Sequence, residues 1–185
     1  MNDLLLLARS DAGVEPHSTA PVDVNQIASE TVRELDPAFR RQGIALSATV
    51  APRPAVINGS AESLRRLFVI LFDNAMKYTP RGGAVSVRVS MAGGDVRSAS
   101  TVVIDVVDSC AGLDPVDQQR AFDRFYRGTA ARRIAPDGSG LGLSIARTIV
   151  ERHGGEISLS SPRDAQGCVA RVVLPSIPRG APQPD

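Results

Sequence analysis

The chain has 185 residues, 43% hydrophobic and 22% charged, enough to bury the core of one globular domain. A net charge of +1, 4% aromatic residues and no tryptophan argue against a nucleic-acid-binding surface. The two cysteines, Cys110 and Cys168, cannot supply a disulfide framework, and nothing in the sequence pairs them into a metal site. The apolar run 4–7 is too short to cross a bilayer, so we expect a cytoplasmic protein without direct membrane insertion.

The first third of the chain predicts two helices and two strands. Residues 1–11 can form a short amphipathic helix, either part of a helix that packs on another helix or an end that folds back on the domain. A second helix opens near Pro21 and Asp23, with Gln26 as the reciprocal capping partner, and Pro37 should kink it or end its first part. Gly43 closes this helix, and strands follow at 44–50 and 55–57.

The strongest predicted helix runs from a Ser60 cap to about Tyr78. Its apolar positions recur at helical spacing and are Leu64, Leu67, Phe68, Leu71, Phe72 and Ala75. The alternating segments 84–91 and 101–107 predict a hairpin around Gly93-Gly94.

The second half of the chain predicts a short helix near 116–122, a polar loop over 128–137 and a helix over 144–153. A closing hairpin follows at 156–160 and 168–174, and the proline-rich end from 175 should be disordered.

A glycine-rich turn, residues 138–143, directly precedes the helix expected at 144–153. Glycine lets backbone N–H groups approach a ligand without a Cβ in the way, and a helix N-terminus adds unpaired donors. Together these features predict a phosphate cradle, although glycine-rich turns are common without one.

Asn74, Lys77 and Tyr78 stand at i, i+3 and i+4 on the predicted long helix, so they share one face. An amide oxygen beside a cation suits a Mg²⁺–phosphate group. The alternative is a solvated helix end at which Lys77 meets the helix dipole.

Asp108 ends an apolar strand, and a turn containing Gly112 follows. A carboxylate there can accept a hydrogen bond from an exocyclic amine such as that of adenine. The alternative is an ordinary aspartate at a strand-end turn.

An aromatic and basic cluster at 122–127 precedes the polar loop. We expect Phe122 and Phe125 to anchor that loop in the core, and Arg124 and Arg127 to be free to meet phosphate.

The order of these motifs resembles the N box, first glycine box, F box and second glycine box of sensor histidine kinases. The matching segments are, in turn, NAMKYTP at 74–80, DSCAGL at 108–113, FDRFYR at 122–127 and GSGLGL at 138–143. The resemblance covers about residues 22–175. Four motifs in this order outweigh the structural reading of each one alone.

The resemblance implies a two-layer α/β sandwich, the Bergerat-type ATP-binding fold, with a mixed sheet, three main helices on one face and a mobile ATP lid at 128–137. It divides the chain into the end of a dimerisation-domain helix (1–15), a catalytic ATP-binding domain (20–175) and a tail (176–185). It implies ATP and Mg²⁺ as cofactors. By the resemblance, Asn74 would coordinate Mg²⁺, Lys77 would contact phosphate and Asp108 would bind adenine. Tyr78 and Gly112 would form walls of the pocket. The phosphate cradle would consist of Gly138, Ser139, Gly140, Leu141 and Gly142.

Two positions depart from the family pattern. Cys110 replaces the first glycine of the usual Asp-x-Gly-x-Gly, so its β-carbon can narrow the adenine pocket or stiffen the turn. Ile70, one turn before Asn74, stands where related ATPases carry a water-activating glutamate, so rapid hydrolysis of ATP is not expected.

The family's phosphoacceptor motif, His-Glu-x-x-Thr-Pro, has no match among the two histidines, His17 and His153. We therefore expect a kinase catalytic domain that phosphorylates a histidine on a separate protein, which then passes the phosphoryl group to a response regulator. The alternatives are a non-catalytic nucleotide sensor and a serine kinase of the anti-sigma-factor type. The amino-terminal helix would dock on the partner's helical bundle.

Overall fold

The computed structural model describes residues 19–93, 100–161 and 166–177, so the helix expected at 1–11 and the end of the chain lie outside the described residues. The elements in chain order are β1 (Ala20–Asp23), α2 (Val24–Gln42), β2 (Ala45–Thr49), β3 (Val56–Gly59), α3 (Ala61–Tyr78), β4 (Ala84–Ala92), β5 (Thr101–Asp108), α4 (Pro115–Arg120), α5 (Thr129–Ile134), α6 (Gly142–Arg152), β6 (Glu156–Ser160) and β7 (Cys168–Pro175).

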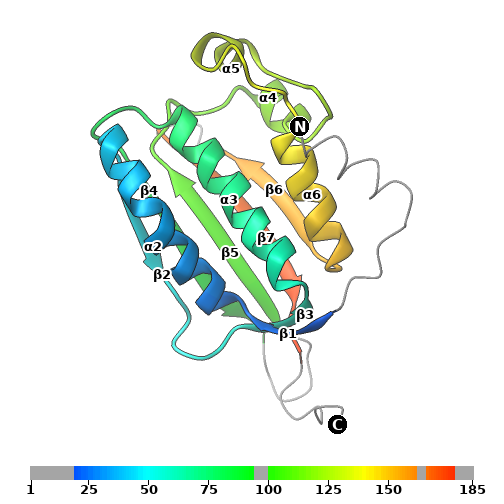
Figure 1. Cartoon of the computed structure of the whole chain (residues 1–185). Coiled ribbons are helices and arrows are strands. Elements are labelled where there is room, and N and C mark those ends of the chain that lie inside the picture. The colour runs from blue at the N-terminus through cyan, green and yellow to red at the C-terminus, as the bar shows by residue number, and fades with distance from the viewer. Residues whose placement is uncertain (1–18, 94–99, 162–165, 178–185) are drawn as a thin grey trace.

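A five-stranded mixed sheet forms one layer, in the order β2-β4-β5-β7-β6. Strands β2 and β4 pair in parallel and the other neighbours pair antiparallel. Helices α2, α3 and α6 cover one face of this sheet, while α4 and α5 lie beyond one end of it (Figure 1). A separate pair, β1 and β3, lies at the opposite end. The expected two-layer α/β sandwich is therefore confirmed.

Helix α3 lies between α2 and α6 and faces the middle of the sheet (Figure 1). All six apolar positions predicted for its inner stripe are buried. Phe72 meets Phe39 of α2 edge to face at 6.3 Å and stacks on Phe68 at 6.1 Å, both measured between ring centroids. Ser60 caps the helix by accepting a hydrogen bond from the Ser63 N–H at 3.2 Å. Local sequence and tertiary packing thus specify the same helix.

The opposite face of the sheet is more polar, because side chains alternate along β4, β5 and β7. Asp105 and Arg171 are direct partners on β5 and β7, and the guanidinium donates two hydrogen bonds to the carboxylate, at 2.7 and 3.0 Å. This bidentate pair raises the pKa of Arg171. Across the described segments, no helix has both the length and the apolar character needed to span a bilayer.

Two predictions near the start of the chain were wrong in detail. Pro21 lies in β1, and the helix begins only after Asp23, whose carboxylate accepts from the Asn25 N–H at 3.0 Å. Gln26 bonds Glu30 instead of completing a capping box. Helix α2 ends at Gly43 as predicted, and it continues through Pro37 to that cap. We attribute this continuation to packing, since Phe39 beyond the proline is 1% exposed.

Candidate functional site

The end of α3 and the glycine-rich turn, far apart in sequence, come together in the structure. A Cβ at Gly142 would lie 3.6 Å from Ile70 Cγ2, and Lys77 lines the same hollow as Gly138. Asn74 lies between Ile70 and Lys77 along α3, one turn from each, and is half-buried. The helix face that carries Asn74 therefore lies opposite the glycine-rich turn.

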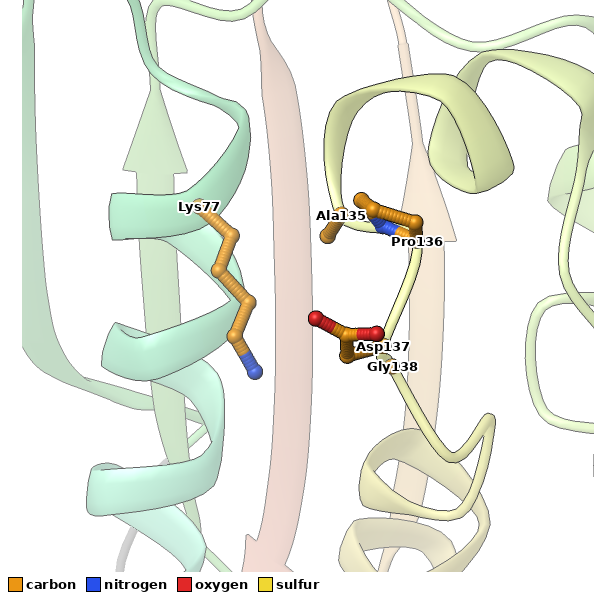
Figure 2. A pocket seen from close by; sticks show the side chains of 5 residues that line it. All are labelled: Lys77, Ala135, Pro136, Asp137 and Gly138. Atoms are coloured by element: carbon orange, nitrogen blue, oxygen red, sulfur yellow. The ribbon is translucent and has the colours of Figure 1, made fainter.

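A hollow of about 240 Å³ separates α3 from the segment before the turn. Figure 2 shows Lys77 reaching into this space from α3, with the Asp137 carboxylate on the facing wall beside Pro136. The Lys77 ammonium is 2.5 Å from the Asp73 carboxylate, one turn back. This i,i+4 pair is readable from the sequence but was not predicted. The pair with Asp73 holds the Lys77 ammonium beside the hollow.

The glycine-rich turn requires glycine at one position above the others. Gly140 has φ +71°, and a Cβ there would lie 2.8 Å from the backbone carbon of Phe125. The Phe125 N–H donates to the Gly140 carbonyl at 3.0 Å. Ser139 Oγ accepts from the Leu141 N–H at 3.3 Å, and Leu141 is buried. The turn is thus fixed by backbone contact with the 122–127 cluster.

The two phenylalanines of that cluster behave differently. Phe122 is buried as predicted, and the Arg147 guanidinium lies 4.5 Å from its ring centroid. The prediction for Phe125 was wrong, because its side chain is 63% exposed. Its φ of +63° is unusual for a residue with a Cβ. The backbone of Phe125 approaches Gly140, and the ring is left outside.

The 128–137 segment is not simply a polar loop, because it contains α5. Arg127 donates to the carbonyls of Pro136 at 2.7 Å and Ala131 at 3.0 Å, and also to that of Ala135. The expectation that Arg127 is free to meet phosphate was therefore wrong, since its guanidinium joins the two ends of this segment. Arg124 is likewise engaged within the chain.

Tyr126 and Asp117 connect this segment to α4. The Tyr126 hydroxyl donates to Asp117 Oδ1 at 2.7 Å, and the Arg120 guanidinium lies 4.2 Å from the centroid of the tyrosine ring. The hydrogen bond to the carboxylate raises the pKa of Tyr126. Sequence reasoning missed this contact because α4 and the cluster show no shared apolar pattern.

Asp108 ends β5 as predicted, and its carboxylate organises the turn that follows. Asp108 Oδ1 accepts from the Cys110 N–H at 2.9 Å, and Cys110 Sγ accepts from the Gly112 N–H at 3.3 Å. Gly112 has φ +92°, which a side chain would disfavour. Tyr78 ends α3 and is half-buried. The described structure does not place Asp108 or Tyr78 among the residues lining the hollow beside Lys77.

The two cysteines, which the sequence does not pair into a metal site, lie together in the structure. The Sγ atoms of Cys110 and Cys168 and a carboxylate oxygen of Asp108 all lie within 4.8 Å of one another. Both thiols are free and buried. A hydrogen bond to Cys168 and burial raise the pKa of the Cys110 thiol, and the same bond lowers the pKa of Cys168. The only signal for this contact is the pairing of β5 with β7, which spacing along the chain does not reveal.

His153 is structural, in agreement with the prediction that it is not an acceptor. Its Nε2 accepts from the Ser60 N–H at 3.1 Å, and its Nδ1 lies 2.7 Å from the Ile149 carbonyl and donates to it. Both ring nitrogens are occupied, so this imidazole ties the end of α6 to the start of α3.

Comparisons with known proteins agree with these observations. Residues 59–178 match the family model described as histidine kinase-, DNA gyrase B-, and HSP90-like ATPase. The chain is 35% identical over 161 residues to the probable sensor histidine kinase TcrY of Mycobacterium tuberculosis, covering 87% of this chain and 32% of TcrY. It is 32% identical over 157 residues to the probable sensor protein PcoS of Escherichia coli, covering 85% of this chain and 32% of PcoS. The chain thus spans about a third of the length of these curated relatives.

Solved structures show the same architecture. The mycobacterial sensor histidine kinase MprB superposes with a TM-score of 0.70 at 29% identity, covering 86% of this chain and 99% of that one. Full-length ShkA in complex with AMPPNP superposes with a TM-score of 0.78 at 27% identity, covering 98% of this chain and 36% of that one.

Proposed function

Because the chain belongs to the histidine kinase-, DNA gyrase B-, and HSP90-like ATPase family, we propose that it binds Mg·ATP and transfers the γ-phosphoryl group to a histidine on a separate protein. It is a histidine kinase ATPase catalytic domain, and the action in trans is the proposed part. The observation that carries the proposal is the hollow between α3 and the 135–138 segment, to which Lys77 and Gly138 both contribute. One cation and one glycine-rich turn beside the same space suit a polyphosphate.

The triphosphate would lie between α3 and α6. Lys77 would neutralise phosphate charge, and the backbone N–H groups of Ser139, Gly140 and Gly142 would donate to phosphate oxygens. The N–H groups of Gly138 and Leu141 already donate to the Ala135 carbonyl at 3.1 Å and to Ser139 Oγ at 3.3 Å, so these two residues would shape the cradle. The Phe125 backbone leaves no room for a Cβ at Gly140, so the turn is held in a conformation that keeps its backbone open, which supports this assignment. Asp108, Gly112 and Tyr78 would form the adenine end of the site, and Arg124 would contact phosphate when the segment beside it closes.

The residues around Asn74 fit a magnesium ion. Its amide oxygen is half-buried one turn from Lys77, and Mg²⁺ characteristically takes one or two protein oxygens together with phosphate oxygens and water. When bound, the ion would neutralise charge on the phosphates. Asn74 would hold it, and the chain's remaining contribution would be to orient the nucleotide.

Transfer to a histidine is favoured over hydrolysis at this site. Ile70 lies one turn before Asn74 and packs against the hydrophobic core, so this position offers no carboxylate to activate water. Phosphoryl transfer needs mainly positioning and charge neutralisation. The acceptor imidazole, and any base that assists it, would come from the partner, since His153, the histidine within the described residues, has both ring nitrogens occupied. A response regulator would receive the phosphoryl group next.

Labelled phosphate transfer tests this function. The chain is mixed with Mg·ATP labelled on the γ-phosphate and a helical partner that carries a His-Glu-x-x-Thr-Pro motif. Acid-labile label on the partner is the expected result. Acid-stable label indicates a serine kinase instead, and nucleotide binding without any transfer indicates a sensor. Calorimetry that detects no uptake of Mg·ATP at millimolar concentration contradicts the whole proposal.

Asn74→Ala locates the metal contact. We expect it to weaken Mg·ATP binding on the order of tenfold, equivalent to about 1.4 kcal/mol, and to reduce transfer. Asn58→Ala, on the exposed position of β3, removes the same amide outside the site and should change neither. Equal behaviour of the two variants would remove Asn74 from the metal site.

A further inference from the structure

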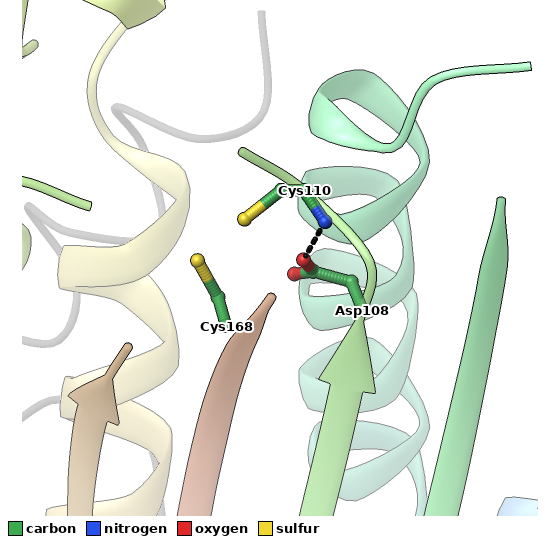
Figure 3. Close-up of side chains that lie close together, drawn as sticks. All are labelled: Asp108, Cys110 and Cys168. Atoms are coloured by element: carbon green, nitrogen blue, oxygen red, sulfur yellow. Dashed lines mark hydrogen bonds between the residues drawn. The ribbon is translucent and has the colours of Figure 1, made fainter. Parts of the chain in front are cut away.

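We propose that Asp108, Cys110 and Cys168 form a binding site for one soft divalent cation, with zinc as the ion that best suits their two sulfurs and one oxygen. The site goes beyond nucleotide binding and does not depend on it. Figure 3 shows the two sulfur atoms facing each other, with the Asp108 carboxylate beside them. Asp108 comes from the end of β5, Cys110 from the turn that follows it, and Cys168 from the start of β7 (Figure 3).

The spacing of the donors suits a tetrahedral ion. The three ligand atoms lie within 4.8 Å of one another. Tetrahedral zinc, with bonds of about 2.3 Å to sulfur and about 2.1 Å to oxygen, places such atoms roughly 3.6–3.8 Å apart. Side-chain movements of about 1 Å therefore bring all three donors into range. Water can supply the fourth ligand.

The backbone around the cluster is held firmly, which favours a preformed site. Asp108 and Cys168 are direct partners in the β5–β7 ladder, and the Gly167 N–H donates to the Cys110 carbonyl at 2.9 Å. Gly167 has φ +117°, and a Cβ there would lie 2.7 Å from the Asp108 carbonyl oxygen. Sheet pairing thus sets the position of Asp108 relative to Cys168, and the bond from Gly167 holds the turn that carries Cys110 beside them.

Hydrogen bonds also orient the donors. The Gly112 N–H donates to Cys110 Sγ at 3.3 Å, and the Cys110 N–H donates to Asp108 Oδ1 at 2.9 Å. Such outer contacts fix the ligands of metal sites. Both cysteines are at most 5% exposed, so a bound ion would be largely shielded from water. Binding would release the thiol protons to solvent as the two zinc–sulfur bonds form.

Cadmium titration tests the site, because cadmium bound to thiolates gives an intense ultraviolet charge-transfer absorption. The full chain is reduced, stripped of metal and titrated with cadmium chloride, then with zinc chloride as competitor. We expect the absorption to rise linearly to one cadmium per chain and zinc to abolish it. No absorption, or saturation at one cadmium per two chains, overturns the proposal.

Substitutions assign the donors. Cys110→Gly introduces the glycine usual in this family and Cys168→Ser keeps the size of the side chain, so both should fold, which circular dichroism checks. Each should lose most of the absorption. Asp108→Asn should keep the absorption but weaken cadmium binding on the order of tenfold. Glu156→Gln, an exposed carboxylate at the start of β6, is the matched control and should bind as the unmodified chain does. Unchanged binding in any of the three cluster variants overturns the assignment.

Metal binding should also oppose nucleotide binding, because both would use Asp108. Zinc should weaken ATP binding more in the unmodified chain than in a Cys110→Gly, Cys168→Ser double variant. Chelation of zinc by ATP itself is the same for both proteins and therefore cancels. An equal effect of zinc on the two proteins contradicts this competition for Asp108.

Discussion

The sheet with its three covering helices and residues 115–138, the lid region that includes the lid expected at 128–137, are held together by different interactions. Helix α3 buries six apolar side chains against the sheet and its neighbouring helices, whereas α4 and α5 bury none. Within the lid region Phe122 alone is buried. Polar contacts hold the rest of this region. Among them, the Arg127 guanidinium donates hydrogen bonds to three backbone carbonyls, and the Tyr126 hydroxyl donates one to the Asp117 carboxylate.

Because of this difference, the two regions should contribute unequally to the stability of the fold and to its rearrangement on ligand binding. Burial of apolar side chains is worth about 1.5–3 kcal/mol for each large residue and resists local opening. A hydrogen bond exchanged with water is worth about 1 kcal/mol, so a segment held by such bonds can rearrange at low cost. We therefore expect the sheet and main helices to set the free energy of unfolding, and the lid region to respond to ligands.

The largest effect should come from the core. Phe72→Ala removes a fully buried ring that contacts Phe39 and Phe68, and should lower the free energy of unfolding by about 3–5 kcal/mol. Val116→Ala removes an apolar side chain that is 56% exposed in the lid region, and should change the free energy of unfolding by less than about 0.5 kcal/mol. Urea denaturation measures both. Similar losses would show that the lid region shares the stability of the core.

A smaller effect is expected at the junction of the two regions. Gly140→Ala places a Cβ against the Phe125 backbone at a positive φ, and should cost about 1–3 kcal/mol. Gly142→Ala is the matched control, because its Cβ would meet Ile70 at an ordinary 3.6 Å. Thermal denaturation compares the two variants. A Gly140→Ala protein as stable as Gly142→Ala would mean that the turn does not depend on its contact with Phe125.

The smallest effect on stability should come from Arg127→Lys. A lysine ammonium cannot reproduce the fork that reaches three carbonyls, so amide exchange in 128–138 should become several-fold faster. Global stability should change by less than about 0.5 kcal/mol. Hydrogen exchange read by mass spectrometry tests this, with the exposed Arg133→Lys as control. Unchanged exchange in 128–138 would show that other contacts hold this segment.

The same contrast explains which parts of the fold and of the candidate site can be predicted from the sequence. The stripe and cap of α3 are local, periodic signals, and the structure reproduces them residue by residue. Motif order likewise identifies the family. The roles of Phe125 and Arg127 depend on a backbone approach between two turns, for which single-sequence patterns carry no signal. The meeting of Cys110 and Cys168 depends on sheet register, which is a long-range property.

His153 gives the paired helices α3 and α6 a fixed end. It joins the start of α3 to the end of α6, whereas Asn74 and the glycine-rich turn lie at the other end of the same antiparallel pair, about 20 Å away at 1.5 Å per residue. A change in the spacing of α3 and α6 on ligand binding should therefore be largest at that far end and smallest beside the imidazole, where two hydrogen bonds hold the helices together.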